Sequence, residues 1–69
     1  MTKTDFLNVI RAIETIGDNE IINCRIICDR NPAIKEERER DRDLILYALM
    51  MAQLEIEKRF PNIKEDDRK

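Results

Sequence analysis

Histidine, serine and tryptophan are missing from this 69-residue chain, and glycine occurs only once. Without histidine the commonest metal ligand and the usual general base are absent, and without serine the usual hydroxyl nucleophile is absent too. The threonines Thr2, Thr4 and Thr15 fall at a predicted helix start or on its surface. We therefore expect no catalytic site, cofactor or metal, and a protein that is not an enzyme.

Cysteine is scarce as well, with only Cys24 and Cys28 present. Two cysteines cannot build a disulfide framework, and this pair lacks Cys-x-x-Cys spacing and a third thiol. We interpret both as small buried hydrophobic residues rather than as a redox pair or half of a metal site. No basic start followed by an apolar core is visible, so we expect no signal peptide and a cytoplasmic protein with reduced thiols.

Neither sign of charge dominates the composition, because 41% of the residues are charged but the net charge is only −2. Nucleic-acid binding relies on a surplus of Lys and Arg, so nucleic acid is not the expected partner. The main apolar run is Leu44–Ile56, interrupted only by Gln53 and Glu55. It is shorter than the roughly 20 residues that cross a bilayer, which argues against a membrane protein.

The N-terminal residues predict a short helix over Asp5–Ile16. Thr4 is a plausible N-cap and Asp5 suits the first turn. Gly17 follows directly, where a left-handed C′ residue commonly ends a helix. The apolar residues at helical spacing form one face: Phe6, Leu7, Val9, Ile10, Ile13 and Ile16.

The next segment, Glu20–Arg30, is compatible with a helix or a strand, and Asp18-Asn19 can cap it. Its isoleucines favour a strand by propensity. Its apolar residues do not alternate, however, and a helix places Ile21, Cys24, Ile27 and Cys28 on one face. We favour the helix.

Asn31-Pro32 is the strongest boundary, since Asn is a good N-cap and Pro a good first helical residue. Nothing breaks a helix from there to Pro61, so one long helix is predicted. Its first half, Lys35–Asp43, has no apolar residue and is expected to be solvated or frayed. Residues 1–61 then form one all-α domain, and residues 62–69 a charged tail that we expect to be disordered.

Apolar side chains in the segment Leu44–Ile56 point all round a helix, which is typical of a helix buried on every side. A chain this short has little else to bury it with, so we predict an intertwined helical homodimer. We assign Leu44, Tyr47, Met51 and Leu54 to the contact with the first helix. Ile45, Leu49, Ala52 and Ile56 are left for a partner, which is a second copy or a foreign protein. The predicted core and interface set is Leu44, Ile45, Tyr47, Ala48, Leu49, Met51, Ala52 and Ile56.

Two other groups of residues are candidates for binding a partner protein. Met50 and Met51 with Tyr47 can form an adaptable surface, because Met repacks readily; packing in the core or dimer interface is the commoner explanation. The charged half offers a docking surface or simply a solvated face. Its possible docking residues are Lys35, Arg38, Arg40 and Arg42.

The chain opens with Met1-Thr2-Lys3-Thr4-Asp5-Phe6-Leu7, followed by Arg11, Thr15-Ile16 and Glu20. In these residues it resembles the Hha/YmoA family of small enterobacterial regulators, which typically has a tyrosine where Phe6 stands. The family's Ala-Ala-Asp-His-Arg signature is missing, since Leu49-Met50-Met51-Ala52-Gln53 stands there, so its residues for docking onto the nucleoid repressor H-NS do not carry over. The resemblance implies an all-helical co-regulator that binds another protein.

These observations favour a small interaction protein that modulates a larger regulatory or host protein. Its size and composition suit an accessory gene of a phage, plasmid or bacterium. The alternative is a dimeric DNA-binding transcriptional regulator that uses the Arg-rich start of the long helix. The acidic residues interleaved between those arginines speak against it.

Overall fold

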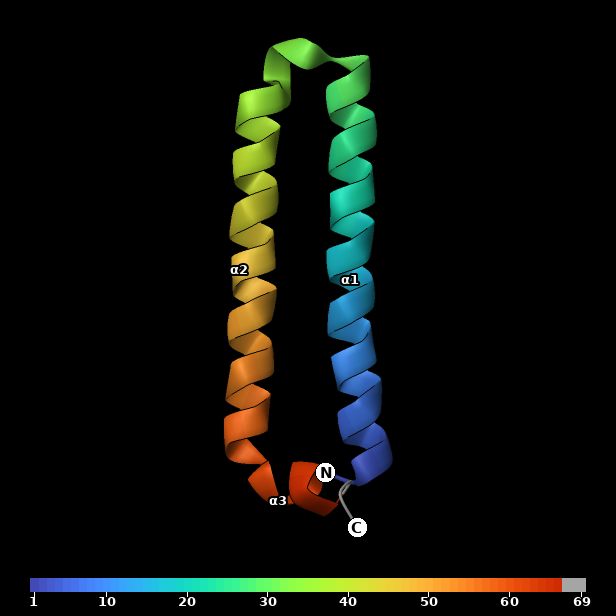
Figure 1. Cartoon of the computed structure of the whole chain (residues 1–69), viewed down its shortest axis with the longest axis vertical. Coiled ribbons are helices and arrows are strands. Elements are labelled where there is room, and N and C mark those ends of the chain that lie inside the picture. Colours follow the sequence, from blue (N-terminus) through green and yellow to red (C-terminus); the bar gives the residue numbers. More distant parts are fainter. Residues whose placement is uncertain (67–69) are drawn as a thin grey trace.

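The chain folds into an antiparallel helical hairpin. The structure is a computed structural model and describes residues 1–66, in which α1 (Lys3–Arg30) and α2 (Lys35–Arg59) lie side by side. The 3-10 helix η1 (Pro32–Ile34) joins them at one end, and α3 (Pro61–Asp66) lies across the open end near the N-terminus (Figure 1). No strand occurs among these residues. The predicted all-α class is confirmed, as is the helical interpretation of residues 20–30.

The start of α1 lies two residues earlier than predicted. Thr2, not Thr4, is the N-cap: its Oγ1 accepts a hydrogen bond from the Asp5 backbone N–H at 3.1 Å. The Asp5 carboxylate accepts in return from the Thr2 N–H at 3.4 Å. This reciprocal pair is a capping box, and it satisfies donors that the first helical turn leaves without partners. Asp5 lies in the first turn as expected.

The predicted break after Ile16 is wrong, because α1 continues through Gly17 to Arg30. The two predicted elements, Asp5–Ile16 and Glu20–Arg30, are therefore parts of one 28-residue helix, and Asp18-Asn19 caps nothing. The reason lies in packing. A methyl group at Gly17 would lie 3.6 Å from Leu46 Cδ2 and 3.7 Å from Leu49 Cδ1, so this glycine faces α2 inside the hairpin.

The boundary at Asn31-Pro32 is confirmed. Asn31 leaves the helical conformation, its N–H donates to the Ile27 carbonyl at 2.9 Å, and Pro32 opens η1. From Lys35 the helix is continuous to Arg59, as the long predicted helix requires. Its charged half, Lys35–Asp43, is helical throughout and is not frayed.

Within the tail that was expected to be disordered, the structure places the short helix α3 over Pro61–Asp66. The Ile63 N–H donates to the Phe60 carbonyl at 3.3 Å, and both side chains are half-buried. Residues 67–69 of that tail lie outside the described residues.

The hairpin has very little interior. Within the described part of the chain, only Phe6, Cys24 and Cys28 are buried. The molecule measures 50 × 17 × 16 Å and has a radius of gyration of 15.6 Å. A compact domain of this length has a radius of about 11 Å. The accessible surface is 5556 Å² for 8.3 kDa, whereas a compact monomer of that mass exposes about 4,600 Å².

Replacement of Gly17 by alanine tests the helical role of this glycine. Gly in a helix interior costs roughly 0.5–1 kcal/mol relative to Ala, and the added methyl group meets the two leucines at ordinary contact distances. We expect Gly17→Ala to raise the free energy of unfolding by up to about 1 kcal/mol, measured by urea titration followed by circular dichroism. Destabilisation of the same size would instead indicate a left-handed residue that ends the helix.

Candidate functional site

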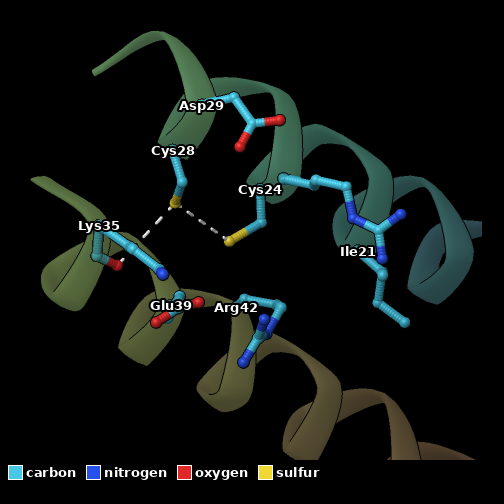
Figure 2. A pocket seen from close by; sticks show the side chains of 8 residues that line it. Ile21, Cys24, Cys28, Asp29, Lys35, Glu39 and Arg42 are labelled. Carbon is cyan, nitrogen blue, oxygen red and sulfur yellow. Dashed lines mark hydrogen bonds between the residues drawn. The ribbon is translucent and has the colours of Figure 1, made fainter. Parts of the chain in front are cut away.

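The two thiols lie together near the loop end of the hairpin. Cys24 is 1% exposed and Cys28 is 7% exposed, and their Sγ atoms are 3.9 Å apart because four helical residues bring them to one side of α1. Figure 2 shows both side chains directed at α2. The Cys24 thiol donates to the Arg38 carbonyl at 3.7 Å, and the Cys28 thiol donates to the Lys35 carbonyl at 3.9 Å.

The charged start of α2 covers these thiols, so the prediction of a solvated segment is wrong for part of it. Arg38, Glu39 and Arg42 are half-buried between the helices. Arg38 Nη1 lies 2.5 Å from Glu20 Oε1, and these side chains are only 19% and 13% exposed. Long charged side chains bury their aliphatic stems while the head groups find partners. This ion pair therefore ties α1 to α2 where apolar side chains are lacking.

Glu20 is the residue that sequence reasoning missed. It was considered only as the start of an ambiguous element and as one point of family resemblance. Its position four residues before Cys24 places it on the same side of α1, facing the arginines of α2. The sequence did hold a signal for it, because Glu20 is an acidic residue on the side of α1 whose other residues face α2.

A pocket of about 270 Å³ opens over the thiols. Its walls carry three cationic and two anionic residues, so no single charge is concentrated there. The lining residues are Ile21, Cys24, Arg25, Cys28, Asp29, Lys35, Glu39 and Arg42. Figure 2 shows α1 and α2 both contributing to it.

The surroundings of Cys28 disfavour the charged form of its thiol. Burial raises the pKa of the Cys28 thiol, and the neighbouring Cys24 thiol raises it further, so the nucleophilic thiolate is disfavoured. The hydrogen bond to Glu20 raises the pKa of Arg38, and the hydrogen bond to Asp43 raises that of Arg42. Both arginines stay charged, and the arrangement fits the interpretation of the cysteines as packing residues.

The structure separates the four residues considered for partner docking. Arg38 is engaged with Glu20, and Arg42 Nη2 lies 2.9 Å from Asp43 Oδ1. Lys35 lines the pocket over the thiols. Arg40 is exposed beside Ala33, Glu36 and Glu37, on the outer side of α2. They do not form one basic surface.

The predicted contact between the apolar run and the first helix is wrong. The residues assigned to the first helix are among the most exposed apolar side chains: Leu44 62%, Tyr47 58%, Leu54 52% and Met51 46%. Leu46 and Leu49 instead approach Gly17, and Ile56 is half-buried. Because the apolar side chains of this segment point in every direction around α2, their periodicity could not indicate which side meets α1.

Ile45, Ala48 and Ala52 of the predicted set are exposed. On α2 the exposed apolar residues lie in two directions. The methionine surface comprises Tyr47, Met50, Met51 and Leu54, which fall within about 100° of arc on a helix of 3.6 residues per turn. Ile45 and Ala52 lie on the other side. On α1, Ile16, Ile22, Ile26 and Ile27 are exposed too.

Residues 1–66 contain no helix long and apolar enough to cross a membrane. Over the same residues, no group of three or more cysteine, aspartate or glutamate side chains is placed to hold a metal ion. Comparison with family models, curated proteins and solved structures gives no match to this chain.

The raised pKa of Cys28 predicts how stability changes at alkaline pH. A buried thiol contributes stability that is fully present below its ordinary pKa of 9.0 and is lost as pH rises through the raised value. We expect the free energy of unfolding of the wild-type protein to fall as the pH rises through and above that ordinary value. Urea titrations should show a shallower fall for Cys28→Ala. Equal slopes for the two proteins would contradict the burial of a neutral thiol.

Proposed function

We propose that this chain is a small non-enzymatic interaction protein, an accessory modulator that works as a homodimer and binds a larger regulatory or host protein. The single observation that supports this most strongly is the imbalance between its interior and its surface. Among the residues that the structure describes, three side chains are buried, while thirteen large apolar side chains are exposed. Soluble monomers rarely expose contiguous apolar patches of this kind, and large ones mark surfaces that bind other molecules.

The methionine surface is the part of the hairpin that best suits a foreign protein. Met50 and Met51 are unbranched and flexible, so they adapt to different partner side chains. Tyr47 adds a rigid ring with a polar tip, a type of residue that is enriched at the centre of protein interfaces. The expected partner segment is an amphipathic helix that lays its apolar face along α2.

The partial resemblance of the first twenty residues to the Hha/YmoA family supports the same class of function, because that family acts by binding another protein. The shared residues Asp5, Phe6 and Glu20 have structural roles in this hairpin: the capping box, the buried ring and the ion pair between helices. The likeness therefore adds to the case for a helical co-regulator and assigns no docking residue.

DNA binding is the less favoured function. Phosphate contacts need cationic side chains that are free to release counterions. Arg38 and Arg42 are both held by carboxylates, and Arg40 stands among Glu36 and Glu37.

Affinity capture with the tagged protein tests the proposed function. From an extract of the source cell, we expect the wild-type protein to retain one protein in stoichiometric amount, and Leu54→Glu to lose it because a charge enters the methionine surface. Ile22→Glu is the matched control, since Ile22 is 55% exposed on α1 and Leu54 is 52% exposed on α2. Loss of capture by the control and not by Leu54→Glu would contradict this surface.

A gel-shift assay separates the two functions. At low salt, where phosphate contacts are strongest, the protein should leave a random DNA duplex unretarded at micromolar concentration. Retardation that decreases as Arg40 and Arg38 are replaced by Gln would support the DNA-binding alternative instead.

A further inference from the structure

One side of the hairpin carries exposed apolar side chains from both long helices. On α1, Ile16 and Ile27 follow the inward-facing Ile13 and Cys24 by three residues. On α2, Ile45 and Ala52 follow the inward-facing Arg42 and Leu49 by the same step. A step of three residues turns about 60° backward around a helix of 3.6 residues per turn. These positions therefore border the contact between the helices, each on one side of it.

The two borders lie on the same side of the hairpin. Because α1 and α2 are antiparallel, an equal step around each helix leads to the same face. The pocket over the thiols illustrates this rule for the opposite face: Ile21 follows Gly17 by four residues and Glu39 follows Lys35 by four, and both line that pocket. The isoleucine–alanine face accordingly contains Val9, Ile16 and Ile27 from α1 with Ile45 and Ala52 from α2. It also contains the exposed Ala48, which lies three residues from Ile45 and four from Ala52 and is therefore next to both on the helix surface.

This face differs from its opposite in charge. Its open-end half, from Val9 to Ile16 and from Ile45 to Ala52, carries no charged residue along either border. Within the same residue ranges the opposite side carries Glu14 on α1, and Asp18 and Asp43 lie just outside them. The hairpin itself does not cover this uncharged face. Its burial against another chain would therefore gain the most free energy per unit of area.

We infer that two copies of the chain join through the isoleucine–alanine face to form a four-helix bundle, with both loops at the same end. This inference rests on the homodimer in the proposed function and names its interface and geometry. Area supports a second copy as the occupant. The hairpin exposes 5556 Å², about 1,000 Å² more than a compact monomer of its mass, and a standard interface buries about 800 Å² on each partner.

The orientation follows from the pattern of large and small residues along the face. Gly17 lies against Leu46 and Leu49, so Ile16 is level with Ala48. A two-fold axis parallel to the helices places α1 opposite α2 of the second copy at equal height. The large Ile16 then meets the small Ala48 of the second copy, as interlocking helices require. If the two loops lay at opposite ends of a fully overlapped dimer, the apolar open-end half of each hairpin would instead pack against the charged loop-end half of the other.

Sedimentation equilibrium at micromolar concentration tests the interface. We expect a dimer for the wild-type protein, at least a 100-fold weaker dimer for Ala52→Glu, which places a charge in the face, and an unchanged dimer for Leu54→Glu. Leu54 is the matched control because it lies two residues away on the far side of α2 and is exposed. A stable dimer of Ala52→Glu, or dissociation of Leu54→Glu alone, would overturn the assigned face.

A second measurement stays decisive if Ala52→Glu fails to fold. A spin label is attached at Ala33→Cys, in the exposed loop, in the Cys24→Ala/Cys28→Ala background, and pulsed dipolar spectroscopy measures the distance between copies. Loops at one end predict on the order of 20 Å, since bundle helices are spaced about 8–10 Å apart. A distance near the 50 Å length of the hairpin would overturn the geometry.

Failure of this inference differs from failure of the proposed function. A wild-type monomer overturns both the four-helix bundle and the homodimer, yet it leaves capture of a larger protein through the methionine surface as a separate result. A wild-type dimer that forms through another face overturns only the interface assigned here.

Discussion

Two helices packed side by side can each bury one stripe of residues, and this constraint governs the whole molecule. The stripe on α1 runs from Phe6 past Gly17 to Cys28, and everything beyond about a third of each helix surface remains in solvent. The chain nevertheless carries 42% hydrophobic residues. This apolar content would suit a larger core, but the hairpin buries only one stripe on each helix. The remaining apolar surface is left for other chains, and the proposed assembly follows from it.

The buried stripe changes character along the hairpin. At the open end it is made of Phe6, half-buried aliphatic residues and the close approach at Gly17. Toward the loop it consists of two thiols and the Glu20–Arg38 ion pair, covered by the stems of charged residues. Breaking one partner of a partly buried ion pair is more harmful than its net contribution suggests. This half therefore specifies how the helices align, while the apolar half supplies most of the hydrophobic stabilisation.

Much of this fold could be predicted from local signals. The boundary at Asn31-Pro32 and the start of the helix after it follow from the fixed φ and missing N–H of proline, which can be read from the residue type alone. The break predicted at Gly17 is wrong because glycine can either end a helix or allow a second helix to approach closely. Only the contact with Leu46 and Leu49 shows that the second role applies here. The side of Leu44–Ile56 that meets α1 was assigned wrongly for a related reason. When apolar side chains point all round a helix, the neighbouring helix determines which side is buried. That neighbour could not be used here, because the buried stripe of α1 had been predicted as two separate elements.

We propose that the hairpin has too small a core to be fully stable alone and that association completes it. The most direct test is the midpoint of thermal unfolding, followed by circular dichroism, over a 100-fold range of protein concentration. Because association stabilises the folded form by mass action, the midpoint should rise steadily with concentration. A helical protein whose midpoint is the same across that range would contradict the claim.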